Sequence, residues 1–160
     1  MNQAVKTGLI AGVAIVALMA GEVYSSSHTL TAIFQFAYRI VFIASIYVGI
    51  KRTRDIELKD EFPFKLGLKA GITTGLVAAI FISVFMVVEM MHINLHEFIA
   101  ELKRNGADNT VIMQQLRMIN LGNAMKVSVF LATLNIVLAF FVSIAVTLLL
   151  RKRGGLINQQ

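Results

Sequence analysis

Four long apolar segments, separated by shorter polar stretches, dominate the pattern of this chain. They cover about residues 5–23, 30–50, 66–88 and 125–150. A helix needs about 20 mainly apolar residues to cross a hydrocarbon core about 30 Å thick, and each segment is close to that length or longer. Because water does not reach that core, the backbone polar groups must pair within each segment, as they do in a helix. The pattern predicts an all-α integral membrane four-helix bundle in a single domain over residues 1–160.

One sizeable polar segment lies outside the spans, at about residues 90–123. Its apolar residues recur at helical spacing over 95–102, and Gly106 signals a helix end. Asp108 or Asn109 can then cap a second helix. We therefore expect an external amphipathic helical hairpin between the third and fourth spans.

The distribution of lysine and arginine predicts the orientation of the spans. If the amino terminus is cytoplasmic, ten basic residues lie on the cytoplasmic side: Lys6, Lys51, Arg52, Arg54, Lys59, Lys65, Lys69, Arg151, Lys152 and Arg153. The other side holds three or four: Lys103, Arg104, Arg117 and the boundary residue Lys126. The positive-inside rule then places both termini in the cytoplasm.

Composition agrees with a membrane protein and narrows the chemistry. Hydrophobic residues make up 57% and charged residues 15% of the chain, where a soluble domain carries about 25% charge. The net charge of +6 lies beside the spans, which favours lipid headgroups over nucleic acid as the partner. The absence of cysteine excludes disulfides and thiolate metal sites.

A short internal repeat relates the first and third spans. Lys6–Gly12 recurs as Lys65–Gly71, with five of seven residues identical at an offset of 59 positions. The repeat suggests two tandem helical hairpins related by an axis along the membrane normal. The alternative is that lysine-anchored spans rich in glycine and alanine resemble one another by composition. The repeat also argues against a cleaved signal peptide ending near Ala20.

Glycines spaced four residues apart place small residues on one face of these two spans. They are Gly8 and Gly12 in the first span, and Gly67, Gly71 and Gly75 in the third. Such faces let two helix backbones approach closely in a membrane. We expect the first and third helices to meet in the bundle, or to form a dimer seam.

Arg39 is an ionisable residue near the middle of the second span, one turn after Gln35. A mid-span arginine costs about 2.5–3.5 kcal/mol on insertion scales, so it should face protein or water and have a partner. Glu22 in the first span and Glu89 in the third are the candidate partners. One interpretation is a polar pocket open to the outer side; the other is a buried ion pair or hydrogen-bond clamp that fixes the bundle.

The residues Glu89, His92 and His96 form a weak candidate metal site. On one continuous helix their spacing would place them on a shared face, where a carboxylate and two imidazoles can bind zinc. Histidines near a membrane interface also hydrogen-bond headgroups, water or neighbours, and we expect no metal and no cofactor. The chain contains no nucleophile-elbow, phosphate-loop or dinucleotide-binding motif.

A mixed basic and aromatic surface follows the second span on the predicted cytoplasmic side. Its members are Lys51, Arg52, Arg54, Phe62, Phe64 and Lys65. Phe62 and Phe64 suit the headgroup level, and the basic residues suit anionic lipid. The same surface is the one that a soluble partner would contact.

Three segments resemble the bacterial membrane family filed as domain of unknown function 4199. They are Ile50–Asp55, Phe64–Gly71 and Lys103–Asp108, together with the opening Lys-x-Gly-Leu, the final Arg-Lys-Arg and the length of about 160 residues. The resemblance implies a four-span protein of the bacterial inner membrane. It supplies no catalytic residues.

We therefore expect a non-enzymatic accessory, assembly or regulatory subunit that associates with itself or with a membrane or cytoplasmic protein. The alternative is a small dimeric carrier or channel that uses the region around Arg39. A third hypothesis is an intramembrane enzyme or metal site centred on Glu89, His92 and His96.

Overall fold

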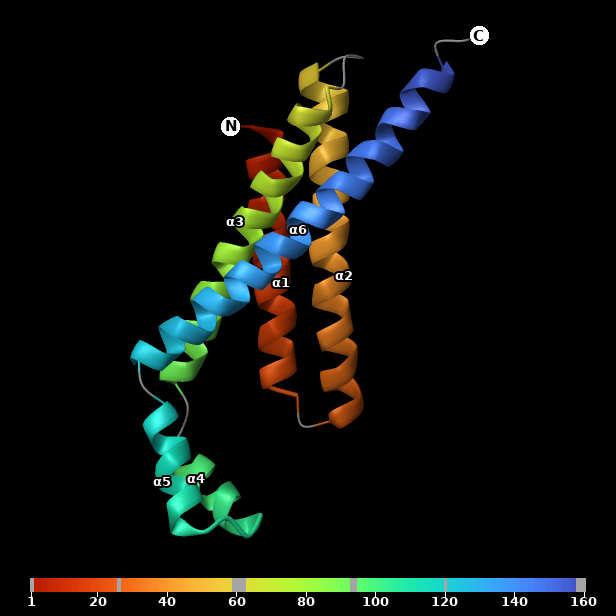
Figure 1. The fold of residues 1–160 in the computed structure, drawn as a ribbon. Helices are drawn as coiled ribbons and strands as arrows, with labels where there is room; N and C mark the ends of the chain where they lie inside the picture. Colours follow the sequence, from red (N-terminus) through yellow and green to blue (C-terminus); the bar gives the residue numbers. More distant parts are fainter. Residues whose placement is uncertain (1, 26, 59–62, 93–94, 120, 158–160) are drawn as a thin grey trace. The chain divides into compact units, whose positions relative to one another are not determined.

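The computed structural model describes residues 2–25, 27–58, 63–92, 95–119 and 121–157. All regular elements in this part of the chain are helical (Figure 1). They are α1 (Gln3–Val23), α2 (His28–Arg52), the π-helical segment η1 (Thr53–Leu58), α3 (Phe64–Met91), α4 (Leu95–Arg104), α5 (Asn109–Met118) and α6 (Leu121–Ile157). The helices α1, α2, α3 and α6 are long and apolar enough to cross a membrane. The predicted all-α class with four spans is confirmed.

The chain divides into two compact units, which are described separately. Unit 1 comprises the described residues within 1–82 and 132–160, and unit 2 comprises those within 83–131. The helices α3 and α6 each contribute a segment to both units.

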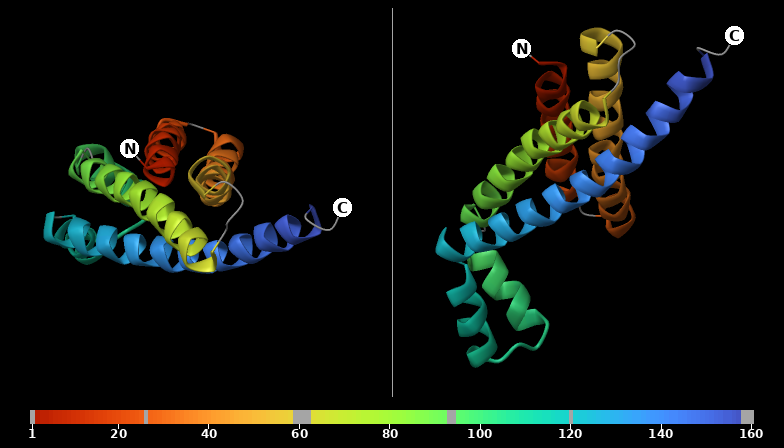
Figure 2. Two further views of the ribbon diagram at one scale, coloured as in Figure 1. Left: turned by 90° about the horizontal axis from the view of Figure 1, so that it is seen from above. Right: turned by 45° about the horizontal axis from the view of Figure 1, so that its top comes forward.

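In unit 1, α1 and α2 form an antiparallel pair joined by a short connection (Figures 1 and 2). The side-chain oxygen of Asn2 accepts a hydrogen bond from the backbone nitrogen of Ala4 at 2.8 Å and so caps the start of α1. Near the connection, a Cβ added at Gly21 would lie 3.0 Å from the ring of Phe34. Glycine therefore allows the ring of Phe34 to approach the α1 backbone closely.

The glycines of α1 pack against α3 within unit 1. A Cβ added at Gly8 would lie 2.8 Å from the Cβ of Val77, and one at Gly12 would lie 2.6 Å from the ring of Phe81. The hydroxyl of Thr74 donates to the carbonyl oxygen of Ala4 at 3.1 Å, which links the same two helices by a hydrogen bond. The predicted meeting of the first and third helices is present.

The glycines of α3 face other helices. A Cβ at Gly71 would meet Ser143 of α6 and Ile50 of α2, and a Cβ at Gly75 would meet Ala139 of α6. The two copies of the internal repeat therefore have different neighbours, because the α1 glycines pack on α3 while Gly71 and Gly75 pack on α6 and α2. Small residues on both helices bring the α3 and α6 backbones close together.

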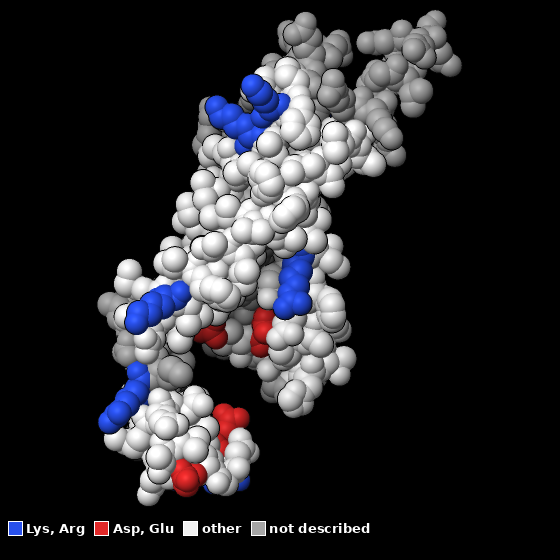
Figure 3. Space-filling model, viewed as in Figure 1, with Lys and Arg blue, Asp and Glu red and all other residues white. Residues whose placement is uncertain are grey.

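Large apolar side chains cover the outward faces of the spans. Phe36 and Ile40 on α2, and Phe130 and Phe141 on α6, are each more than 60% exposed. Over the spanning windows, 39% of α1 but only 11% of α6 is buried within the chain. Figure 3 shows a mostly uncharged surface over the spans, with basic side chains where α3 begins and a further basic and acidic patch part-way along. Exposed apolar surface of this extent fits the lipid environment that four spans imply.

Unit 2 contains the predicted pair of helices α4 and α5. The chain turns between them at Gly106, whose φ of +80° is a left-handed conformation that suits glycine. The backbone nitrogen of Ala107 donates to the carbonyl of Leu102 at 3.0 Å, and that of Gly106 donates to Lys103 at 3.1 Å. These two bonds close the end of α4 as a Schellman motif.

The start of α5 is capped as the sequence predicts. A side-chain oxygen of Asp108 accepts from the backbone nitrogen of Val111 at 2.8 Å. Elsewhere in unit 2, the hydroxyl of Ser128 on α6 donates to the carbonyl of Ser83 on α3 at 3.1 Å. Ile112 of α5 and Ala124 of α6 are buried in this unit.

Candidate functional site

Two of the four polar residues expected inside the spans, Glu22 and Gln35, meet where α1 and α2 pair. The side-chain nitrogen Nε2 of Gln35 donates a hydrogen bond to Oε1 of Glu22 at 2.7 Å. Both side chains are half-buried. The sequence analysis placed these two residues in the same candidate cluster, and the structure brings them into contact. The reason is that the antiparallel pairing of α1 and α2 sets Glu22 at the level of Gln35.

Arg39 lies one turn further along α2 than Gln35. Its side chain is exposed, and its guanidinium carbon lies 5.8 Å from the ring centroid of Tyr38. Among the described residues, Arg39 makes no ion pair with a carboxylate, and the ion pair found is Arg54 with Asp55 at 2.7 Å. The expected ion pair of Arg39 with Glu22 is therefore absent, and Glu22 is hydrogen-bonded to Gln35.

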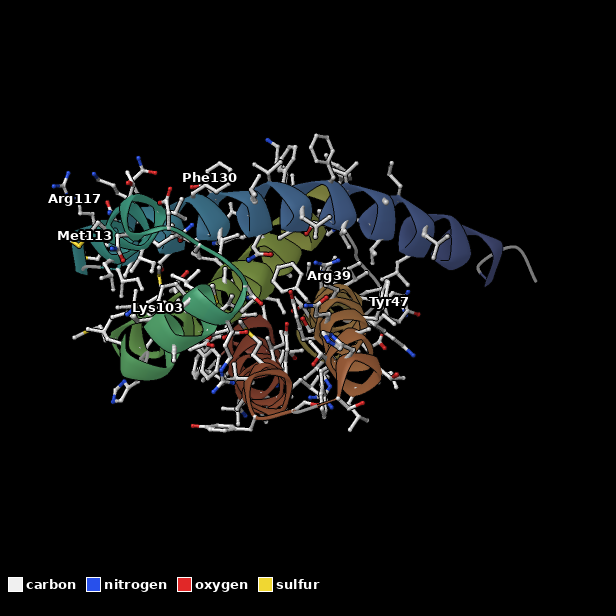
Figure 4. All side chains as sticks on the ribbon, turned by 90° about the horizontal axis from the view of Figure 1, so that it is seen from below. Arg39, Tyr47, Lys103, Met113, Arg117 and Phe130 are labelled. Carbon is white, nitrogen blue, oxygen red and sulfur yellow. The ribbon has the colours of Figure 1, made fainter. Side chains whose placement is uncertain are left out.

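The positions of Glu22 and Arg39 on their helices show which way they face. The buried stripe of α1 runs through Ile15 and Met19, and Glu22 continues it three residues later. The buried stripe of α2 runs back from Ile46 through Phe42, and Arg39 continues it by three residues. Figure 4 shows Arg39 on the side of α2 toward α6. The faces that are buried further along α1 and α2 thus carry polar side chains at this level, half-buried at Glu22 and exposed at Arg39.

A helical side chain leans toward the amino end of its own helix. Arg39 therefore leans toward the level of Gln35, about 6 Å away along the axis. Glu22 already lies at that level, through its hydrogen bond to Gln35. We call the set Glu22, Gln35 and Arg39 the polar cluster of unit 1.

The other predicted polar residue, Glu89, belongs to the α3 segment of unit 2. It is half-buried and has an interaction partner in the structure.

The candidate metal residues do not share one helix. The helix α3 ends at Met91, His92 follows it, and His96 lies in α4. Nδ1 of His92 lies 2.8 Å from the carbonyl oxygen of Val88, within hydrogen-bond distance. The side chain of His96 lies outside the described residues. Across the side chains that the structure describes, no group of three or more metal-ligating residues occurs.

The predicted cytoplasmic surface begins at the end of α2. Lys51 and Arg52 are exposed there. The sequence pattern predicts that the span ends at about residue 50, but in the structure the chain stays helical and continues as the π-helical segment Thr53–Leu58. Beyond this segment, Lys65 is exposed and Phe64 is half-buried at the start of α3. Phe62 lies outside the described residues.

The sequence analysis did not identify the α6 residues that pack against the glycines of α3. On α6, Ala139, Ser143 and Thr147 are buried and recur every four residues. This is the same spacing as Gly67, Gly71 and Gly75 on α3. A search for small residues of any kind at that spacing, and not for glycine alone, identifies the α6 face.

Comparison with known proteins places the chain in one family. Residues 6–152 match a family described as a protein of unknown function, DUF4199. Searches among curated proteins and among solved structures find no match. Because the match covers most of the chain, the chain belongs to the DUF4199 family of unknown function.

Proposed function

We propose that this chain is a non-enzymatic subunit of the bacterial inner membrane that assembles with or regulates another protein. The supporting observation is the helical surface at the end of α2. Lys51 and Arg52 are exposed there, and η1 extends the helix six residues beyond them. With the exposed Lys65, these residues present ordered positive charge to anionic lipid or to an acidic partner surface.

The packing of unit 1 supports the same proposal. The glycines Gly8, Gly12, Gly71 and Gly75 all contact other helices of the same chain. Their role is to assemble the spans closely, and the exposed basic surface remains for contact with another protein.

The test is crosslinked co-purification from native membranes, followed by mass spectrometry of the bound proteins. We expect one stoichiometric partner, and we expect the triple variant Lys51→Gln, Arg52→Gln, Lys65→Gln to lose it. The matched control is Lys103→Gln with Arg104→Gln, which removes charge from α4 and should keep the partner. Recovery of the chain crosslinked only to itself would reject the accessory role.

The proposed orientation places both termini in the cytoplasm, as the lysine and arginine distribution indicates. Since the chain has no cysteine, single cysteines report this directly. We expect a membrane-impermeant maleimide to label Ser27→Cys and Asn105→Cys in spheroplasts. It should label Arg52→Cys and Lys65→Cys only after the membrane is permeabilised. The reverse pattern would invert the proposed topology.

The polar cluster of unit 1 favours a second candidate function, a small dimeric carrier. Within the spans lie a hydrogen-bonded carboxylate and an arginine that makes no ion pair with the described residues, and such groups suit a substrate or proton site. Two results would favour this candidate. Crosslinking would recover the chain bound only to further copies of itself, and Arg39→Leu would abolish transport while the protein stays folded. Loss of folding in Arg39→Leu would instead indicate a structural role.

A further inference from the structure

Two opposite charges lie in the polar cluster of unit 1 without forming a pair. Glu22 accepts from Gln35 at 2.7 Å through one carboxylate oxygen. In the described part of the chain, neither Glu22 nor Arg39 makes an ion pair. An arginine within a membrane span normally has a counter-charge, because an uncompensated guanidinium in hydrocarbon is costly.

The contacts that exist leave defined groups for a ligand. The guanidinium of Arg39 is exposed and can offer a planar fork of donors, which matches the oxygens of phosphate or carboxylate. The second oxygen of Glu22 remains as an acceptor for a cation. Gln35 fixes the carboxylate, so the acidic and basic groups stay separate.

We propose that Glu22 and Arg39 bind a zwitterionic group, with its phosphate or carboxylate on Arg39 and its ammonium on Glu22. A simple anion would be attracted by Arg39 but repelled by Glu22, and a simple cation would experience the opposite. A ligand with one charge of each sign satisfies both groups. The inference does not depend on the accessory role proposed above.

Two sources supply this chemistry. One is the ethanolamine phosphodiester headgroup of a membrane lipid, and the other is a small soluble zwitterion that enters from the end of unit 1 where α1 joins α2. Gln35 lies seven residues from the start of α2, about 10 Å along the axis, so the bound group would sit below that helix end.

The experiment is native mass spectrometry of the purified full-length chain with phosphatidylethanolamine and phosphatidylglycerol of identical acyl chains. We expect phosphatidylethanolamine to bind about tenfold more tightly, since a charge-assisted hydrogen bond contributes about that factor or more. Arg39→Gln and Glu22→Gln should each reduce this binding about tenfold. Glu22→Gln should also remove the preference for phosphatidylethanolamine over phosphatidylglycerol.

Controls separate the site from general attraction to charge. Lys103→Gln removes an exposed basic side chain from α4, outside the polar cluster and the basic surface, and should leave the preference unchanged. Arg39→Lys keeps the charge without the planar fork and should bind with intermediate affinity. Gel filtration of each variant checks folding, and Arg39 is a suitable target because its side chain is exposed.

Competition by soluble glycerophosphoethanolamine distinguishes the two sources. Displacement of the lipid at comparable concentration supports a free zwitterion as the ligand, and failure to displace it supports the lipid headgroup. Equal binding of the two lipids, unchanged binding in Arg39→Gln, or no binding of either lipid or the soluble headgroup would overturn the proposal. The crosslinking result bears on the accessory role and is independent of these outcomes.

Discussion

Gly71→Leu should prevent unit 1 from assembling, so that the purified chain aggregates in place of eluting as a single species. A Cβ at this position already meets the Ser143 side chain, with the Ser143 Cβ at 2.7 Å and the Ile50 Cδ1 at 2.8 Å. Overpacking a tight core by a few methylene groups costs about 1–3 kcal/mol or more, and leucine adds a whole branched side chain here. The measurement is gel filtration and thermal unfolding in detergent.

A matched substitution and a compensating one test the cause. Ala145→Leu adds a similar apolar group on the exposed side of α6, two residues from Ser143, and should leave elution unchanged. Gly71→Ala should lower stability by about 1–3 kcal/mol. Adding Ser143→Gly to Gly71→Ala should restore most of that loss, since it removes the atoms nearest to the new methyl group. No restoration would mean that the cost at Gly71 arises elsewhere.

Gly12→Leu should separate α1 from α3 and produce the second largest loss of stability. The added Cβ would lie 2.6 Å from two ring carbons of Phe81. The ring cannot shorten or bend, so it must rotate away or the helices must move apart. We expect a fall in the thermal midpoint and a loss of protection from proteolysis in the α1–α2 connection.

The control for this prediction is Ala14→Leu, which lies on the exposed face of the same helix two residues away. It should leave the thermal midpoint near that of the unmodified chain. Combining Phe81→Ala with Gly12→Leu removes the ring on α3 that the new leucine on α1 would contact, so the double variant should recover part of the lost stability. If Ala14→Leu is as damaging as Gly12→Leu, the α1–α3 contact is not the cause.

Sequence patterns predicted the elements of this protein more fully than their contacts. Apolar length predicted the four spans, and the capping chemistry of Gly106 and Asp108 predicted the ends of α4 and α5. These are local properties of the chain. The choice of the helix that packs on each face of α3 depends on residues far away in the sequence. The spacing of Gly71 and Gly75 indicates a close approach, but the partner depends on small residues about 70 positions away.

The polar cluster shows the same limit. The sequence identified Glu22, Gln35 and Arg39 because polar residues are rare within spans. It left open whether an ion pair or a hydrogen bond joins them. In the structure, the α1–α2 register aligns Glu22 with Gln35, and that register follows from apolar contacts such as Gly21 with Phe34.

The two neighbouring faces of α3 have a consequence for biogenesis. Within unit 1, Thr74, Val77 and Phe81 of α3 contact α1, whereas the α3 glycines Gly71 and Gly75 pack against α6. During synthesis α1 precedes α3, so the first face can be satisfied as soon as α3 enters the bilayer. On the glycine face, Ile50 of α2 can reach Gly71 early, but the contacts with Ser143 and Ala139 form only when α6, the last of these helices, leaves the ribosome. Damage at Ser143 should therefore appear as late clearance by membrane proteases of a chain that has already been inserted.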